Sequence, residues 1–207
     1  MKLLLFLLLA ISSSSGQLSP NGRQQVLDFH NKLRSQVALG VFSANGTIKP
    51  PARNMERLTY GQQFERLAQD YVADCPDGLE IPIGRNIGMN YYTTKVDETY
   101  NSMDEYVIDA LNDWAEEFQV NGWLSTIYND TSISAASQMV WAGTKYVGCG
   151  VKRCDPINVV VVCMYYQQGN LVGRPIYKEG PPCTACPPMR ICPGQKECCD
   201  RVMGLCT

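Results

Sequence analysis

The chain contains 207 residues, of which 45% are hydrophobic and 18% are charged, and it carries a formal net charge of −2 at pH 7. This length and apolar content suffice for one sizeable hydrophobic core, and length alone allows one or two domains. A slightly acidic chain without a basic patch has nothing to neutralise a phosphate backbone, so we expect no nucleic acid as a partner.

The N-terminal stretch MKLLLFLLLAISSSSG, residues 1–16, has the charged, apolar and small segments of a secretory signal peptide in the right order. A buried N-terminal helix is the less favoured alternative, because serines end the apolar run. No other stretch approaches the roughly 20 apolar residues of a transmembrane helix. We therefore expect cleavage after Gly16 and a secreted, extracellular protein with no transmembrane segment.

The ten cysteines form an even set, which in a secreted chain predicts disulfides rather than metal or redox chemistry. Cys183 and Cys186 have the spacing of zinc ligands, but an oxidising compartment favours disulfides there too. Two N-x-T sequons begin at Asn45 and Asn129, and we expect both to be glycosylated surface loops.

Apolar residues recur at helical spacing between Pro20 and the stop signal at Gly40, which predicts an amphipathic helix. Its core-facing residues are Val26, His30, Leu33 and Val37. His30 is the only histidine, so any Ser-His or Cys-His mechanism would depend on it. No nucleophile lies near it in sequence, so we expect a buried core histidine that is hydrogen-bonded to its neighbours.

Two more segments have helical periodicity. In YGQQFERLAQDYVADC, which Cys75 ends, one face carries Phe64, Leu67 and Tyr71. In MDEYVIDALNDWAEEF, the core-facing residues are Tyr106 or Val107, Ala110, Leu111, Trp114 and Phe118. Adjacent helical residues point about 100° apart, so at most one carboxylate of the pair Glu116-Glu117 faces the core.

Further along the chain the pattern changes to strands. YVGCGVKRC and NVVVVCMYY are rich in β-branched and aromatic residues, and Asp155-Pro156 between them predicts a turn. Cys149 and Cys163 lie on these two strands, where a disulfide is geometrically plausible. From Gly180 the chain is rich in proline and cysteine and lacks apolar periodicity, so we expect disulfides to hold it. Helices around a small antiparallel sheet give an α+β fold.

Two stretches, SQMVWAGT and VVVCMYYQQGNLVG, resemble the two signature motifs of the CAP superfamily of cysteine-rich secretory, antigen 5 and pathogenesis-related proteins. FHNKLRSQVALG and the closing KEGPPC…GLC are similar to the nematode branch of venom-allergen-like and activation-associated secreted proteins. The resemblance implies an α-β-α sandwich with a central cleft over residues 17–179 and a cysteine-rich hinge over residues 180–207. The motif residues are Gln138, Met139, Val140, Trp141, Cys163, Tyr165, Gly169 and Asn170.

In that family the cleft usually holds two histidines and two glutamates, which can bind a divalent metal. Here Ala135 stands at one histidine position, and no histidine follows Cys75 where the second is usual. Arg85 replaces one glutamate, and only Glu117 matches. A methyl group and a guanidinium are not metal ligands, so we expect small-residue packing at Ala135, no metal and no cofactor. We predict an Arg85–Glu117 salt bridge, with a solvent-exposed Arg85 of no consequence as the alternative.

The pairing of the remaining cysteines is only partly determined. If Cys149 pairs with Cys163, Cys75 is left for Cys154 in the main domain. The pairing within the hinge stays open for Cys183, Cys186, Cys192, Cys198, Cys199 and Cys206.

Three classes of function are compatible with a protein of this kind. The first is a non-enzymatic protein that recognises an extracellular protein, as in the host interaction and immune modulation that the resemblance implies. The second is a sterol or fatty-acid carrier with a groove between helices, although the candidate groove residues fit ordinary core better: Leu33, Val37, Val107 and Leu111. The third is an enzyme, but Ser137 has no base, so we expect no catalytic residue.

Overall fold

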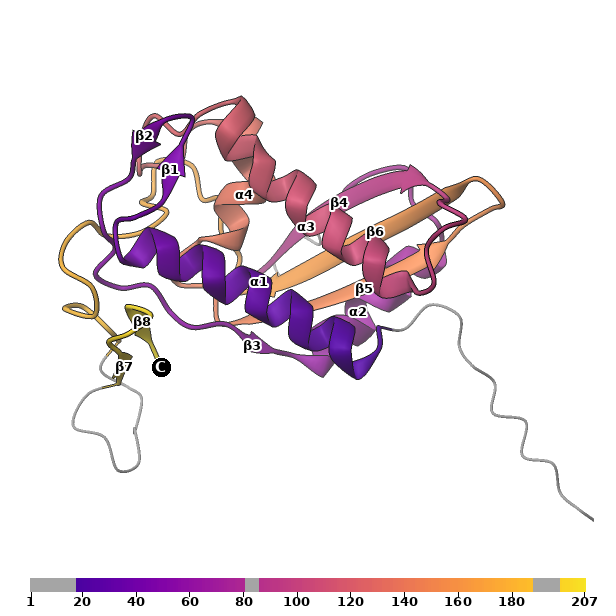
Figure 1. The fold of residues 1–207 in the computed structure, drawn as a ribbon, viewed down its shortest axis with the longest axis horizontal. Coiled ribbons are helices and arrows are strands. Elements are labelled where there is room, and N and C mark those ends of the chain that lie inside the picture. Colours follow the sequence, from indigo (N-terminus) through magenta and orange to yellow (C-terminus); the bar gives the residue numbers. More distant parts are fainter. Residues whose placement is uncertain (1–17, 81–85, 188–197) are drawn as a thin grey trace, which may run out of the picture.

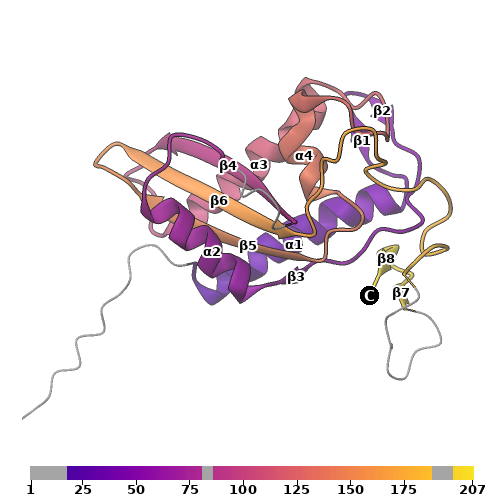
Figure 2. The ribbon, with the colours of Figure 1, turned by 180° about the vertical axis from the view of Figure 1, so that it is seen from behind.

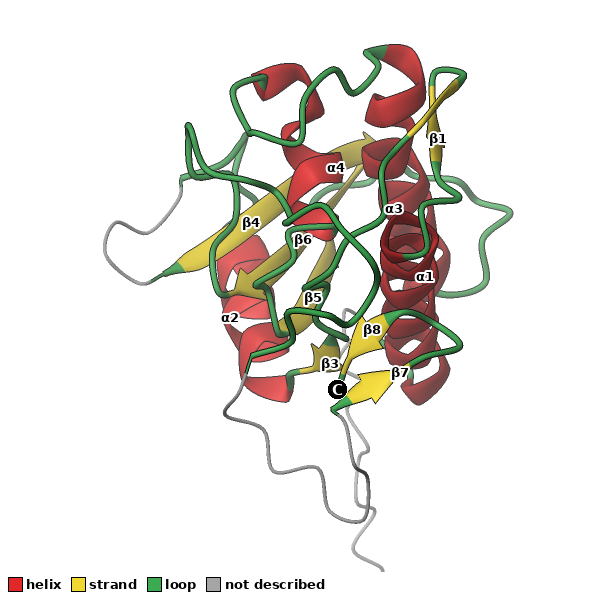
Figure 3. Cartoon of the chain, turned by 90° about the vertical axis from the view of Figure 1, so that its left-hand side faces the viewer, coloured by secondary structure: helices red, strands yellow, loops and turns green. Residues whose placement is uncertain are grey.

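The computed structural model of the protein describes residues 18–80, 86–187 and 198–207. A four-stranded sheet lies between two helical layers (Figures 1 and 3). Helices α1 and α3 lie side by side on one face of the sheet, and α2 crosses the opposite face (Figure 2). This is the α-β-α sandwich that the sequence predicted. The proposed signal peptide, residues 1–16, lies outside the described residues.

Helix α1 (Pro20–Ala38) begins and ends at the predicted signals. The Ser19 hydroxyl accepts a hydrogen bond from the Gly22 N–H at 3.0 Å, which caps the first turn. Beyond the last turn, Gly40 has φ of +69°, the left-handed conformation that glycine adopts most easily. The helix buries the predicted face against the sheet and α3.

Helices α2 (Gln62–Ala73) and α3 (Met103–Val120) follow the predicted periodicity. Phe64 is buried, and Leu67 and Tyr71 are partly buried against the second, smaller core cluster. The core-facing residues of α3 are all buried: Tyr106, Val107, Ala110, Leu111, Trp114 and Phe118.

The sheet has the strand order β3-β5-β6-β4. The two predicted strands are its centre, where β5 (Tyr146–Arg153) pairs antiparallel with β6 (Asn158–Tyr166). Two strands were missed. β4 (Ile87–Lys95) pairs antiparallel with β6, and the two-residue β3 (Thr59–Tyr60) pairs parallel with β5. The sheet is therefore mixed rather than antiparallel as expected, because β3 is parallel to β5. The sequence did not predict these two strands because β3 is too short to leave a periodic signal and the polar Asn90 interrupts the apolar start of β4.

Shorter elements complete the fold. Helix α4 (Ser134–Met139) directly follows the 3₁₀ turn η1 (Thr131–Ile133). It carries Ala135 and the motif residues Gln138 and Met139. Two small hairpins lie away from the main sheet, formed by β1 (Ser43–Ala44) with β2 (Thr47–Ile48), and by β7 (Cys199–Asp200) with β8 (Leu205–Cys206).

The four residues considered as a lipid groove between helices are ordinary core. None is more than 7% exposed, and all belong to the main hydrophobic cluster: Leu33, Val37, Val107 and Leu111. The core interpretation is confirmed and the groove interpretation of these residues is wrong, because the two helices that carry them pack together and against the sheet. None of the helices in the described part of the chain is long and apolar enough to cross a membrane.

Disulfides join the elements in the expected places. Cys149 of β5 is bonded to Cys163 of β6, directly opposite in the register, and Cys75 after α2 is bonded to Cys154. In the tail, the described pairs are Cys183–Cys199 and Cys186–Cys206, and Cys198 is also disulfide-bonded. Cys192 lies outside the described residues.

The tail is held by more than its disulfides. The Cys206 N–H donates to the Met55 carbonyl at 2.8 Å, and the Arg57 N–H donates to the Cys206 carbonyl at 2.7 Å. Leu205 is fully buried, so the end of the chain contributes to the main core. The disulfides expected in this segment are present, and main-chain hydrogen bonds and the burial of Leu205 add to them. The domain boundary at residue 180 stays a prediction.

Candidate functional site

Glu117, the acidic residue expected in the cleft from the sequence, lies in the last turn of α3 beside the start of α4. Its Oε2 accepts a hydrogen bond from the Ala136 N–H at 2.9 Å. Burial raises the pKa of this carboxyl to about 7, and hydrogen bonds from the main chain of Ala136 and Ala135 act in the opposite direction. Glu116 is exposed, so only one carboxylate of the pair faces inward, as predicted.

Of the other expected cleft positions, the structure describes Ala135, whose methyl side chain is not a metal ligand. Ala135 is half-buried on α4, and its carbonyl accepts a hydrogen bond from the Asn90 side chain at 2.9 Å. Arg85 lies outside the described residues, so its pairing with Glu117 stays a prediction. In the described ranges, no cluster of three or more His, Cys, Asp or Glu side chains could hold a metal. One carboxylate beside a methyl group does not fit the usual four-ligand zinc site.

His30 is a core residue, as predicted. Its side chain is fully buried in α1. Nδ1 lies 2.8 Å from the Val26 carbonyl, and because a carbonyl can only accept, Nδ1 carries the proton. Nε2 then accepts a hydrogen bond from the Tyr165 hydroxyl at 3.0 Å. Burial lowers the pKa of His30 to about 4, so the ring is neutral at physiological pH.

The hydrogen bonds continue from His30 through Tyr165 of β6 and Asn90 of β4 to Ala135 of α4. The Asn90 side-chain N–H group donates to the Tyr165 hydroxyl at 3.3 Å and to the Ala135 carbonyl at 2.9 Å. Asn90 is 2% exposed and lies on the strand that the sequence did not predict. Buried polar groups that are mutually bonded in this way fix the positions of the elements that carry them.

The signature residues are hydrogen-bonded to one another. The Gln138 Oε1 accepts a hydrogen bond from the Gly169 N–H at 2.9 Å, and the Ser137 hydroxyl donates to Asn170 Oδ1 at 2.7 Å. A Cβ at Gly169 would lie 2.8 Å from the Trp141 ring, so only glycine fits there. The two motifs therefore hold α4 against the segment that follows β6. The other motif residues are buried in the core: Met139, Val140 and Cys163.

Sequence reasoning missed Arg34, which is fully buried in α1. Its guanidinium donates hydrogen bonds of 2.6 to 3.2 Å to the main-chain carbonyls of Glu56, Met139, Trp141, Ala142 and Thr144. Burial lowers the pKa of Arg34 to about 9, and the charge of Glu56 opposes this shift. A signal was available, because Arg34 lies four residues after His30 on the buried face.

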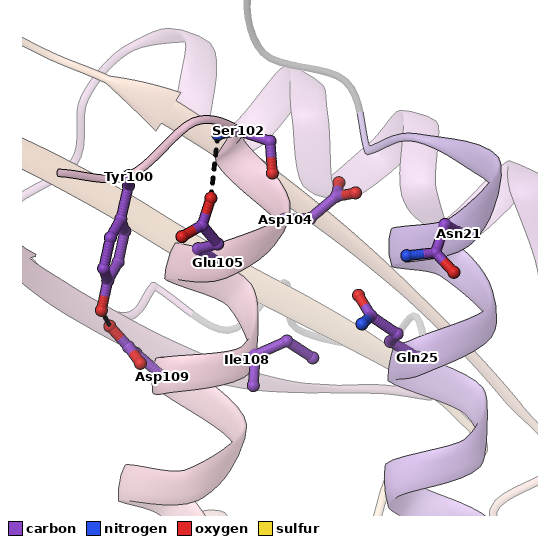
Figure 4. A pocket seen from close by; sticks show the side chains of 8 residues that line it. All are labelled: Asn21, Gln25, Tyr100, Ser102, Asp104, Glu105, Ile108 and Asp109. Atoms are coloured by element: carbon purple, nitrogen blue, oxygen red, sulfur yellow. Dashed lines mark hydrogen bonds between the residues drawn. The ribbon is translucent and has the colours of Figure 1, made fainter.

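A groove between the N-terminal ends of α1 and α3 has a volume of about 430 Å³ (Figure 4). Its walls carry the carboxylates of Asp104, Glu105 and Asp109, and the Tyr100 hydroxyl donates to Asp109 at 2.5 Å. Like charges repel, so this groove is unsuited to the carboxylate of a fatty acid.

A second, larger pocket of about 680 Å³ lies beside α2 at the end of the sheet. Phe64 stacks on Tyr166 with ring centroids 5.6 Å apart, and Tyr146 lies 5.9 Å from Phe64. Leu67 and Ile87 add aliphatic walls. Ligand pockets are typically apolar with few polar groups, and this pocket fits that description better than the acidic groove.

The model of the family described as "Cysteine-rich secretory protein family" matches residues 27–165. The chain belongs to the CAP family. Among curated relatives, this CAP protein is 31% identical over 187 residues to human cysteine-rich secretory protein LCCL domain-containing 1, covering 83% of this chain and 35% of that protein. It is 28% identical over 202 residues to venom allergen 5 of Tityus serrulatus, covering 91% of this chain and 48% of that protein. The chain therefore spans about a third to a half of the length of these relatives.

Solved structures agree with the fold. The structure titled "Crystal structure of NaASP2 with Zn2+" superposes with a TM-score of 0.79 at 28% identity, covering 92% of this chain and 97% of that one. The structure of BmVAL-1 superposes with a TM-score of 0.78 at 26% identity, covering 93% and 97%. The zinc in the first title is a property of that protein.

Proposed function

We propose that this CAP protein is secreted, is not an enzyme, and acts by binding another extracellular protein. The observation behind the non-enzymatic part of the proposal is the burial of His30, the only histidine in the sequence, with both ring nitrogens hydrogen-bonded. Ser137 is also fully buried, and its hydroxyl is bonded to Asn170 and to the Ser134 carbonyl. His30 is therefore inaccessible as a general base, and Ser137 is inaccessible as a nucleophile.

Secretion and glycosylation are supported by the leader-like N-terminus, the disulfides and the position of the sequons. Asn45 lies in the exposed turn between β1 and β2, and Asn129 is exposed just before η1. An oligosaccharide transferase needs an accessible acceptor, and both asparagines meet that requirement. We propose N-glycans at both positions.

The names of relatives suggest which partners to test first. A mouse relative is named peptidase inhibitor R3HDML, and a bovine relative is named peptidase inhibitor 16. Similarity to the ASP and VAL structures supports a place in the nematode branch, with host or immune modulation as the setting. Because of these names, secreted peptidases are the first class of partner to test. Surface loops could recognise such a partner without any catalytic residue.

The test uses purified, glycosylated, disulfide-intact protein. We expect saturable binding to at least one member of a panel of secreted peptidases and other extracellular proteins, measured by surface plasmon resonance. The Ser137→Ala variant is the matched control, and it should bind as the wild type does. Hydrolysis of a peptide library by the wild type that Ser137→Ala abolishes would overturn the non-enzymatic assignment.

A carrier of sterol or fatty acid is the second candidate, and the aromatic pocket beside α2 is the observation that favours it. Mass spectrometry of lipids extracted from the secreted protein, against a mock-secreted control, tests this function. About one lipid per protein, lost in a Tyr166→Ser variant but retained in an Ile108→Ser variant of the acidic groove, would put carrier function first. Absence of lipid leaves protein recognition as the function.

A further inference from the structure

The sequence contains three Asn-Gly pairs, at Asn21-Gly22, Asn45-Gly46 and Asn121-Gly122. In such a pair, the main-chain nitrogen of glycine can attack the side-chain amide carbon of asparagine, because glycine has no side chain to obstruct the approach. The local sequence is equally favourable in all three. The structural surroundings of the three pairs differ.

Two of the pairs are held in place. Gly22 is buried in the first turn of α1, and its N–H donates to the Ser19 hydroxyl at 3.0 Å. The Asn121 side chain donates to the Ser132 carbonyl at 2.7 Å, and Gly122 is buried. In the first pair the attacking nitrogen is hydrogen-bonded, and in the second the amide is anchored, so each must open locally before it can react.

The third pair is accessible. Asn45 and Gly46 form the two-residue turn between β1 and β2, with φ of 45° and 77°, and both are exposed. Such positive angles are typical of a type I′ turn. Open space surrounds Gly46, where an added Cβ would meet nothing within 4 Å. Among the described residues, the Asn45 side-chain amide makes no hydrogen bond, and only its main-chain N–H is held, by Gln119 Oε1 at 3.1 Å.

We propose that Asn45-Gly46 is the selective deamidation site of the folded chain when Asn45 carries no glycan. The Gly46 nitrogen loses its proton and bonds to the Asn45 side-chain carbon, the bond from that carbon to Nδ2 breaks, and the nitrogen leaves as ammonia. Water then opens the cyclic imide at either carbonyl, which gives aspartate or isoaspartate. Water is the only co-reactant and no oxidation occurs.

The reaction changes the end of α3 as well as the turn. The new carboxylate lies next to Gln119, close to the C-terminus of α3, where negative charge is unfavourable. Isoaspartate also lengthens the main chain inside a two-residue turn, which disturbs the pairing of Ala44 with Thr47. A glycan on Nδ2 removes the free amide and so protects this turn during the extracellular life of the protein.

The test uses the full secreted chain with Thr47→Ala, which removes the sequon and keeps the Asn-Gly pair. The disulfide-intact protein is aged at mildly alkaline pH in heavy-oxygen water and analysed by peptide mapping. We expect conversion at Asn45 to be at least about tenfold faster than at Asn21 or Asn121, because the latter two must open locally first. Equal rates at the three positions in the folded protein would overturn the proposal.

A reduced and denatured sample of the same variant is the control. There we expect the three asparagines to convert at similar rates, because the turn, the cap and the anchoring hydrogen bond are lost. If Asn45 kept its advantage in the denatured chain, the selectivity would come from local sequence, and the role assigned to the fold would be wrong.

Discussion

Glu117 of α3 is joined to α4 by the hydrogen bond from the Ala136 N–H to its carboxylate, at 2.9 Å. The carboxylate of Glu117 thus helps to fix this short helix. The carboxyl keeps a pKa of about 7 in this half-buried place, because burial disfavours its charged form.

Arg85 should change that pKa if it pairs with Glu117. A neighbouring guanidinium lowers a carboxyl pKa, so we expect Arg85→Met to raise it. In Arg85→Met, the pKa of Glu117 in the folded state lies above the ordinary value of 4.5, so the folded chain binds this proton more tightly than the unfolded chain does. Stability then falls as pH rises from about 4.5 to 7, by about 1 kcal/mol once partial exposure is allowed for.

The measurement is urea unfolding at pH 5 and pH 8 for wild type and Arg85→Met, with Arg66→Met on α2 as the matched surface control. Identical pH profiles for all three proteins would mean that Arg85 points to solvent and that the predicted salt bridge is absent.

His30 predicts a pH dependence of the opposite sign. Its folded-state pKa of about 4 lies below the ordinary 6.5, so between these values the unfolded chain binds more protons. Stability should fall by roughly 3 kcal/mol as pH drops from 6.5 to 4. His30→Gln should be less stable at pH 7 but should lack this part of the acid dependence, in chemical denaturation. If the variant had the same slope as the wild type, the titrating group would be another residue.

Arg34 predicts a large loss of stability without any surface change. Arg34→Met removes the donor to five carbonyls, and we expect a loss of about 3 to 5 kcal/mol because buried acceptors are left unsatisfied. Arg153→Met is the matched control, since Arg153 forms an exposed pair with Glu98 at 3.1 Å that should contribute at most about 1 kcal/mol. Equal losses in the two variants, measured by denaturant unfolding with disulfides intact, would contradict the structural role of Arg34.

Gly169 tests whether the signature motifs are structural. Gly169→Ala places a Cβ against the Trp141 ring, so we expect a loss of about 1 to 3 kcal/mol and altered tryptophan fluorescence. Gly78→Ala, where an added Cβ would meet nothing within 4 Å, should leave Tm unchanged. If Gly169→Ala left the stability unchanged, the close contact between Gly169 and Trp141 would not be needed to hold the two motifs together.

Features that depend on local pattern could be predicted from the amino-acid sequence. Periodicity located α1, α2 and α3 with their buried faces, and β-branched runs located β5 and β6. The burial of His30 also followed, because a lone histidine on an apolar helical face needs local partners and the core supplies them. Residue identity alone showed that Ala135 cannot be a metal ligand.

Contacts between residues far apart in the sequence could not be predicted in this way, because they depend on how the elements pack. The carbonyls that Arg34 binds include that of Met139, 105 positions away, and Asn90 reaches the Tyr165 hydroxyl and the Ala135 carbonyl from a strand with no clear periodic signal. The three Asn-Gly pairs likewise differ only through their packing. A periodic pattern reports which side of an element is buried, whereas the partner of a buried polar group depends on how the elements are stacked, and that is set by the whole core at once.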